Sequence, residues 1–255
     1  MKRKPINSYL KVIQFFVWCA IVVSLVACSK GTAPVVRKSA VIGINNQIKD
    51  DTAIVNQIAP YKAKLQAEIS KVIGESESDM PKHKTGEYAL GNWIADVYLE
   101  EAKAKFQKAQ IGLVASGGIR AGIQKGPFTI GNAFEIMPFE NELVVLTIKG
   151  SVLSEIIAEH FQSKKLNFSG ISVSLNSANS TILLNGNPTH PDSLYYLATS
   201  DYLANGGDNL NMLKKRTAIF NTKTKVRTAI IEHIEKLSNT KKKIIAPTIN
   251  RVKFL

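Results

Sequence analysis

The sequence predicts an α+β domain in which helices pack against a mixed sheet that contains hairpins, and two observations support this class. Short apolar runs typical of strands alternate along the chain with longer segments whose apolar residues recur at helical spacing. An Asn185-Gly186 pair, a turn signal typical of hairpins, closes the strand predicted at residues 181–184. Because hairpins and strand-helix units occur together, a purely parallel, doubly wound fold is not expected.

The N-terminal region has the layout of a signal peptide. Four basic residues precede an apolar run at residues 12–27, which is too short to predict a bilayer span. Its end, Leu25-Val26-Ala27-Cys28, resembles the bacterial lipobox, which implies cleavage before Cys28 and a diacylglycerol on its sulfur. The alternative is an uncleaved N-terminal anchor helix. Both interpretations place the rest of the chain outside the cytoplasm.

Three segments are therefore predicted: a lipoprotein signal peptide at residues 1–27, a tether at 28–38 and a domain at 39–255. The tether has little apolar periodicity, as expected of a linker. The lipid on Cys28 would hold the protein on a bacterial membrane, facing the periplasm or the cell surface. The other cysteine, Cys19, lies in the discarded region, so no disulfide is expected and a small disulfide scaffold is excluded.

Charge and size limit the possible functions. The formal net charge is +13, and residues 1–27 contribute four positive charges and no negative ones, which leaves +9. These charges are spread along the chain without interleaved aromatic residues, whereas a nucleic-acid footprint is concentrated on one face. No nucleic-acid partner is therefore expected. The roughly 200 residues after the tether are enough for one domain held together by its own core.

The expected elements follow from periodicity and turn signals. Trp93 lies on the apolar stripe of its helix and is expected in the core rather than in a binding site. The predicted strands span residues 39–48, 111–115, 141–148, 171–175, 181–184 and 195–199. The first predicted helix begins at Asp51, extends to about Val72 and ends at Gly74. Further helices are predicted at residues 88–107, 151–161 and 226–237. A turn-rich connection is expected at residues 74–81.

Several common catalytic patterns are missing from the sequence. There is no phosphate loop, no nucleophile elbow and no Cys-x-x-Cys pair. The four histidines, His83, His160, His190 and His233, are far apart and stand in none of the short motifs typical of two-metal phosphohydrolases. His160 and His233 are expected on helices as surface or structural residues. We therefore expect no catalytic residues and no metal ligands in this chain.

Three polar or glycine-rich turns at strand ends are the candidate binding elements. In such turns, backbone N–H groups and exposed side chains can contact a ligand, glycine allows close approach, and arginine offers a planar fork of donors. The turns are residues 115–120, which contain Ser116, Gly117, Gly118 and Arg120; residues 137–141, with Phe139 and Asn141; and residues 200–208, with Tyr202, Gly206, Gly207 and Asp208.

The order and spacing of five motifs resemble the C-terminal, substrate-recognition domain of 5'-nucleotidases. The similarity extends over residues 51–255. Its motifs are the segment at 86–96, the Gly-Gly-Ile-Arg turn ending at Arg120, Pro-Phe-x-Asn at 138–141, Ser-Gly-Ile at 169–171 and Gly-Gly-Asp at 206–208.

The resemblance implies a binding site for a nucleoside or a 5'-nucleotide. It places the base between the rings of Phe139 and Tyr202, and the ribose diol on Asp208. Lys84 and Arg120 correspond to arginines that reach the ribose and phosphate side. Two substitutions depart from the family pattern: Lys84 replaces a frequent arginine, and Tyr202 replaces a common phenylalanine. Ala115 stands where some relatives have an asparagine that contacts the base.

The largest departure is the missing N-terminal metallophosphatase domain, for which only about 50 residues remain here. The resemblance therefore implies the recognition half of a split phosphohydrolase in nucleotide catabolism, with divalent metals held only by a separate metallophosphatase chain. The alternative is a free-standing nucleotide- or nucleoside-binding lipoprotein used in scavenging. A third possibility is an interaction or structural lipoprotein whose domain has lost ligand binding. Apart from a catalytic partner, the protein is expected to be monomeric and inactive as an enzyme on its own.

Overall fold

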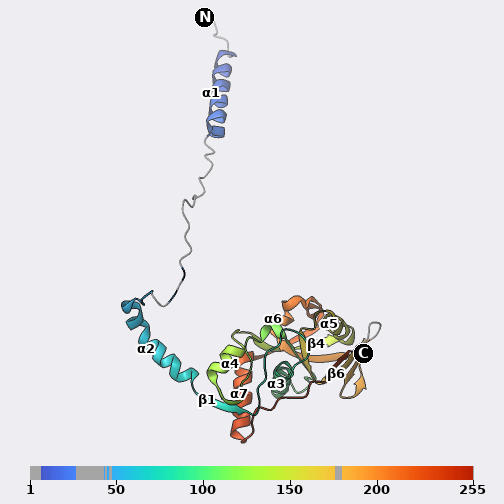
Figure 1. Ribbon diagram of the computed structural model, residues 1–255. Coiled ribbons are helices and arrows are strands. Elements are labelled where there is room, and N and C mark those ends of the chain that lie inside the picture. Colours follow the sequence, from blue (N-terminus) through green and yellow to red (C-terminus); the bar gives the residue numbers. More distant parts are fainter. Residues whose placement is uncertain (1–6, 27–42, 44, 46–47, 176–179, 255) are drawn as a thin grey trace, which may run out of the picture. The chain divides into compact units, whose positions relative to one another are not determined.

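The computed structural model describes residues 7–26, 43, 45, 48–175 and 180–254 (Figure 1). The chain divides into two units, Met1–Thr52 and Ala53–Leu255. Helix α1 (Asn7–Val26) belongs to the first unit. Among the described residues, no helix combines the length and the apolarity needed to cross a membrane.

Two predictions for the N-terminal part fall outside this description. Cys28 and the tether at residues 28–38 are not among the described residues, so cleavage and lipidation stay predictions. The strand expected at residues 39–48 also falls largely outside them. Its described residues, Gly43, Asn45 and Ile48, belong to no strand.

The second unit alternates strands and helices. In chain order its elements are α2 (Thr52–Ile69), β1 (Val72–Ser76), α3 (Ala89–Lys105), β2 (Ile111–Ala115), η1 (Ser116–Gly118), β3 (Gly126–Thr129), α4 (Ile130–Ile136), β4 (Glu142–Lys149), α5 (Gly150–Ser163), β5 (Leu166–Ser169), β6 (Ile171–Leu175), β7 (Ser180–Leu184), β8 (Asn187–Pro188), β9 (Leu194–Ser200), α6 (Asp201–Ala204), η2 (Gly207–Asn209), η3 (Asn211–Lys215), β10 (Ala218–Lys225), α7 (Val226–Asn239) and β11 (Val252–Phe254).

The central sheet has five strands in the order β10-β4-β9-β2-β5. Strands β2 and β9 run parallel, and the other neighbouring pairs run antiparallel. A smaller sheet has the order β11-β6-β7-β8, and β1 pairs with β3. Parallel and antiparallel pairs thus occur in one sheet, which confirms the predicted α+β class with a mixed sheet.

Both faces of the central sheet are buried, as the side chains of β4 show. Leu143 and Val145 join the apolar cluster that contains the buried residues of α3 and α7. Val144, Leu146 and Ile148 join the second cluster, which contains the buried residues of α5. Successive side chains of a strand point to opposite faces, so a strand covered on both sides must be apolar at nearly every position. This explains why β4 reads as a continuous apolar run.

The turn signal at Asn185-Gly186 is confirmed, although it joins β7 to β8. Both residues have positive φ, 50° and 81°, the combination that favours Asn-Gly in a two-residue hairpin. The connection between β6 and β7 runs through residues 176–179, which lie outside the described part of the chain.

The helix predicted from Asp51 to about Val72 is shorter in the structure, and its apolar residues are not buried. Helix α2 stops at Ile69, and both Val72 and Gly74 belong to strand β1, so Gly74 does not end the helix. A Cβ on Gly74 would lie 2.4 Å from Cγ2 of Ile234, so this glycine allows β1 to contact α7. No residue of α2 is buried, and Pro60 lies inside the helix.

Candidate functional site

The three turns identified in the sequence meet at one edge of the central sheet. Strands β2 and β9 run parallel, so their carboxyl ends, Ala115 and Ser200, lie at the same edge. Strand β4 runs antiparallel to β9, and Leu143 near its start is paired with Ser200. The turns that follow β2 and β9 and the turn that precedes β4 therefore converge, although they are far apart in the sequence.

A cavity of about 340 Å³ lies between these turns. Seven of its lining residues were predicted as binding residues: Gly117, Gly118, Arg120, Phe139, Asn141, Tyr202 and Asp208. The others are Tyr98, Val114, Ala115, Met137, Ser200 and Leu203.

Phe139 and Arg120 form one side of the cavity. The side chain of Phe139 is 40% exposed, which leaves a large part of its ring free for stacking. Cζ of Arg120 lies 5.9 Å from the centroid of that ring, within the range of a cation–π contact. The backbone N–H of Arg120 donates to the carbonyl of Ile136 (2.8 Å), which fixes the first turn against the end of α4, directly before the second turn.

Tyr202 and Asp208 form another side of the cavity and contact each other. The Tyr202 hydroxyl donates to Oδ1 of Asp208 (3.3 Å) and accepts from the Asp208 backbone N–H (3.3 Å). A Cβ on Gly207 would lie 2.4 Å from the tyrosine ring, so only glycine lets the ring lie this close to the backbone. A Cβ on Gly117 would lie 3.1 Å from Oδ2 of Asp208, which brings the carboxylate close to the first turn.

The backbone around Asp208 adopts an unusual conformation. Gly206, Asp208 and Asn209 have φ values of 91°, 50° and 66°, in the left-handed region. Glycine adopts this region freely, and aspartate and asparagine tolerate it better than most residues, so the strain is confined to Asp208 and Asn209. Strained backbone of this kind is typical of ligand-binding sites, and here it positions the Asp208 carboxylate at the cavity.

Four of the predicted binding residues do not line the cavity: Lys84, Ser116, Gly206 and Gly207. Lys84 is exposed. Ser116 is buried, and its Oγ accepts a hydrogen bond from Nδ2 of Asn167 (3.4 Å). Gly206 and Gly207 shape the turn that carries Asp208. The two glycines therefore act on the site through backbone geometry, whereas the side chain of Ser116 forms a buried hydrogen bond behind it.

The apolar part of the lining was missed because it comes from core positions. Tyr98 on α3 and Val114 on β2 are buried, as are Met137 and Leu203. From sequence alone, such residues cannot be distinguished from the rest of the core. Burial, and secondarily the nearby Asp201 carboxylate, raise the pKa of the Tyr98 phenol, so Tyr98 is neutral at physiological pH.

The motif at residues 86–96 holds the C-terminal segment in place rather than lining the cavity. The Asp96 carboxylate accepts two hydrogen bonds from the Arg251 guanidinium (2.9 and 2.7 Å). The Glu87 carboxylate accepts from the backbone N–H groups of Arg251 and Val252 (2.9 and 3.0 Å). These contacts position β11 beside β6.

His160 is a structural histidine. It is fully buried, and its Nδ1 accepts a hydrogen bond from the backbone N–H of Leu166 (3.1 Å). Burial lowers its pKa to about 4, so the ring is neutral at physiological pH. His233 is also buried rather than at the surface.

Comparisons with known proteins identify the family of this chain. The family model of the 5'-nucleotidase C-terminal domain matches residues 66–215. The Endonuclease YhcR of Bacillus subtilis strain 168 is 31% identical over 210 residues, which are 78% of this chain and 17% of that protein. A 5'-nucleotidase of Vibrio vulnificus is 28% identical over 211 residues, 79% of this chain and 37% of that protein.

Solved structures show the same fold. A 5'-nucleotidase precursor from Thermus thermophilus has a TM-score of 0.68 at 25% identity, over 78% of this chain and 42% of that one. The NAD nucleotidase of Haemophilus influenzae has a TM-score of 0.63 at 19% identity, over 80% of this chain and 41% of that one. This chain thus spans less than half the length of each of these proteins. It belongs to the family defined by the C-terminal domain of 5'-nucleotidases.

Proposed function

We propose that this protein recognises a nucleoside or 5'-nucleotide at the cavity between the three turns. The observation that carries the proposal is the convergence of two exposed aromatic rings, Phe139 and Tyr202, with one carboxylate, Asp208, and one guanidinium, Arg120, around a single cavity. Each group has chemistry suited to one part of a nucleotide. Aromatic rings stack on a base, a carboxylate accepts hydrogen bonds from ribose hydroxyls, and a guanidinium binds phosphate oxygens.

We further propose that the protein is the recognition half of a split 5'-nucleotidase and acts in nucleotide catabolism. The relatives that the chain matches are much longer, and two of them, from Vibrio vulnificus and Vibrio cholerae, are named 5'-nucleotidases. Their names attribute hydrolysis to the whole proteins. For this chain, a separate metallophosphatase chain would supply the divalent metals and the catalytic groups.

Binding is tested by calorimetry with a nucleoside and its 5'-monophosphate, using the chain from Ser29 onward. We expect a dissociation constant of about 10 μM to 1 mM, because stacking and sugar hydrogen bonds are partly offset by association entropy. Phe139→Ala, Tyr202→Ala and Asp208→Ala are each expected to weaken binding roughly tenfold or more. Each stacking contact contributes about 1–3 kcal/mol, and about 1.4 kcal/mol corresponds to tenfold.

Two variants serve as controls for this experiment. Tyr202→Phe keeps the ring for stacking and removes only the hydroxyl contacts with Asp208, so it should weaken binding less than Tyr202→Ala does. Tyr61→Ala removes an exposed tyrosine on α2 that does not line the cavity, so affinity should not change. Wild-type affinity in both Phe139→Ala and Tyr202→Ala would show that the base is not held between these rings.

We propose that the protein is anchored by lipid on Cys28 and faces the periplasm or the cell surface. The support is the sequence at residues 25–28 after the basic and apolar N-terminal segment. The Cys28→Ser variant should lack the lipid and move from the detergent phase to the aqueous phase in a detergent-partition experiment. If it partitions as the wild type does, the protein is held by an uncleaved N-terminal helix instead.

A further inference from the structure

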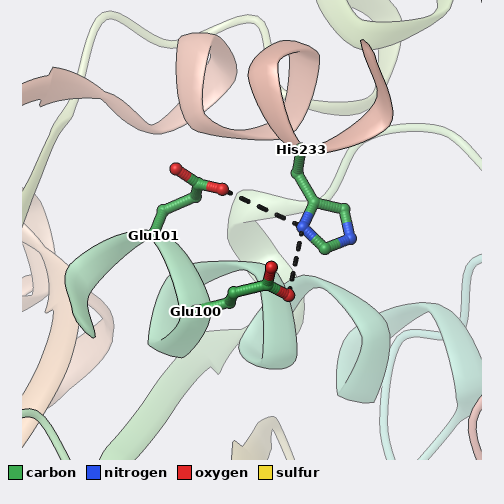
Figure 2. Close-up of side chains that lie close together, drawn as sticks. All are labelled: Glu100, Glu101 and His233. Atoms are coloured by element: carbon green, nitrogen blue, oxygen red, sulfur yellow. Dashed lines mark ion pairs between the residues drawn. The ribbon is translucent and has the colours of Figure 1, made fainter. Parts of the chain in front are cut away.

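Two glutamates and a histidine from different helices point at one another on the side of the domain where α3 and α7 pack together (Figure 2). Glu100 and Glu101 lie on α3, and His233 lies on α7. Nδ1 of His233 is 3.5 Å from Oε2 of Glu100 and 4.0 Å from Oε1 of Glu101. One donor atom from each residue lies within 4.8 Å of the other two.

The histidine is buried but incompletely satisfied. His233 is 8% exposed, and its Nδ1 has no hydrogen-bond partner among the described residues. Burial lowers the pKa of this imidazole, which outweighs the opposite effect of the nearby Glu100 carboxylate. A neutral ring has a lone pair on one nitrogen, and metal ligation requires that form. The second ring nitrogen points away from both glutamates (Figure 2).

The two carboxylates beside this ring differ in their contacts with lysine. Oε1 of Glu100 accepts a hydrogen bond from Nζ of Lys236 (2.8 Å), while its other oxygen, Oε2, faces His233. The Glu101 side chain is 13% exposed, and its ion-pair contact among the described residues is the one with His233. Burial raises the pKa of the Glu101 carboxyl, which reflects the cost of keeping its charge there. Lys236 thus forms a hydrogen bond with Glu100, whereas Lys236 and Lys105 act on the Glu101 carboxylate only through Coulomb attraction.

We propose that Glu100, Glu101 and His233 bind one divalent transition-metal ion, with zinc the best match to the donor set. Zinc accepts imidazole nitrogen and carboxylate oxygen at about 2.0–2.2 Å, whereas calcium and magnesium prefer oxygen alone. An ion placed among the three donor atoms would draw them together by less than about 1 Å from their present positions. Lys236 would remain on the outer oxygen of Glu100 and orient that ligand.

The site is separate from the nucleotide cavity, because none of its three residues lines that cavity. It connects α3 to α7, both of which contribute buried side chains to the same core cluster. A bound ion would therefore cross-link two core helices in a chain for which no disulfide is expected. This role does not depend on the proposed recognition of nucleotides.

Titration of the tag-free, chelator-treated chain with Zn²⁺ tests the proposal, by calorimetry and by the thermal unfolding midpoint. We expect one site per chain and a Zn²⁺-dependent rise of the midpoint, since an ion that binds only the folded state stabilises it. Glu101→Gln and His233→Ala should each weaken this binding at least tenfold and remove the rise.

The matched control is Glu235→Gln, which removes an exposed glutamate from α7, the helix that carries His233. The Glu235 side chain is outside the donor set, so Zn²⁺ affinity should stay within about twofold of the wild type. Absence of Zn²⁺ binding in the wild type would overturn the site, as would equal affinity in Glu101→Gln and wild type. Binding of Ca²⁺ in preference to Zn²⁺ would overturn the assignment to a transition metal. Glu101→Gln changes one carboxylate to an amide of nearly the same size at a partly exposed position, so this variant should fold. It therefore tests the site even where His233→Ala does not fold.

Discussion

The purified chain is expected to leave 5'-nucleotides intact in the presence of Mn²⁺, Co²⁺ or Zn²⁺, and to support hydrolysis once a stand-alone metallophosphatase chain from the same organism is added. A pair of metal ions activates water and neutralises the phosphate, and positioning by the recognition domain adds to this effect. Together these contribute several kcal/mol to lowering the barrier, which is about a thousandfold or more in rate. Release of inorganic phosphate with and without the added chain measures the difference.

The described residues contain one group of potential metal ligands, Glu100, Glu101 and His233, and it does not line the nucleotide cavity. It offers one site, whereas the proposed reaction uses two ions. In the mixture, Arg120→Ala should lower the rate roughly tenfold through lost phosphate contacts, about 1.4 kcal/mol, without changing the metal content of the partner. Steady turnover by this chain alone, abolished by a point change within it, contradicts the split enzyme. Binding without any activating partner favours a free-standing nucleoside-binding protein.

Gly112→Ala is expected to destabilise the domain by about 3 kcal/mol, because its methyl group has no space. The added Cβ would lie 2.1 Å from the carbonyl oxygen of Ala95 on α3. Both clashing groups belong to packed backbone: β2 is paired on both sides, and α3 packs across it. For a domain of this size, the thermal midpoint should fall by roughly 6–12 °C.

Gly118→Ala is the matched control for this substitution. A Cβ at Gly118 would have no heavy atom within 4 Å, so its effect should stay within about 0.5 kcal/mol. Thermal unfolding followed by circular dichroism compares the two variants. A midpoint for Gly112→Ala within about 2 °C of the Gly118→Ala value would contradict the tight packing of β2 on α3.

The elements that could be predicted from the sequence are those with a complete local signal. Strand β2 was placed at its observed bounds, because a short apolar run ends at a glycine-rich turn. Helix α3 was predicted to within one or two residues at each end, because it has a clear apolar stripe. Both elements are determined mainly by burial, which periodicity reports directly.

The missed elements lack such a signal. Strand β10 lies at the edge of the central sheet and has exposed or half-buried residues at nearly every position, so neither an apolar run nor a clean alternation marks it. Strand β5 is only four residues long and follows α5 closely. Gly74 was read as a helix end because glycine often has that role. Its actual role, close contact with Ile234, depends on a residue far along the chain.

The candidate site was predictable in its polar part and unpredictable in its apolar part. Turn residues such as Arg120 and Asp208 were predictable because they lie in polar, glycine-rich turns at strand ends, whose order and spacing resemble the family pattern. Lining residues such as Tyr98 contribute to the core at the same time. The Glu100–Glu101–His233 cluster could not be anticipated either, because it forms only when α7 packs on α3.

Helix α2 is a segment whose own length can change. None of its 18 residues is buried, and Pro60 in its interior removes a hydrogen-bond donor and costs about 3 kcal/mol of helix stability. An isolated helix only slightly longer than about 12–15 residues is marginal in water, so α2 should exchange between helix and coil within microseconds. The segment spans about 27 Å as a helix and up to about 60 Å when extended. Melting of α2 would therefore about double the distance that the chain can span between Thr52 and Ile69.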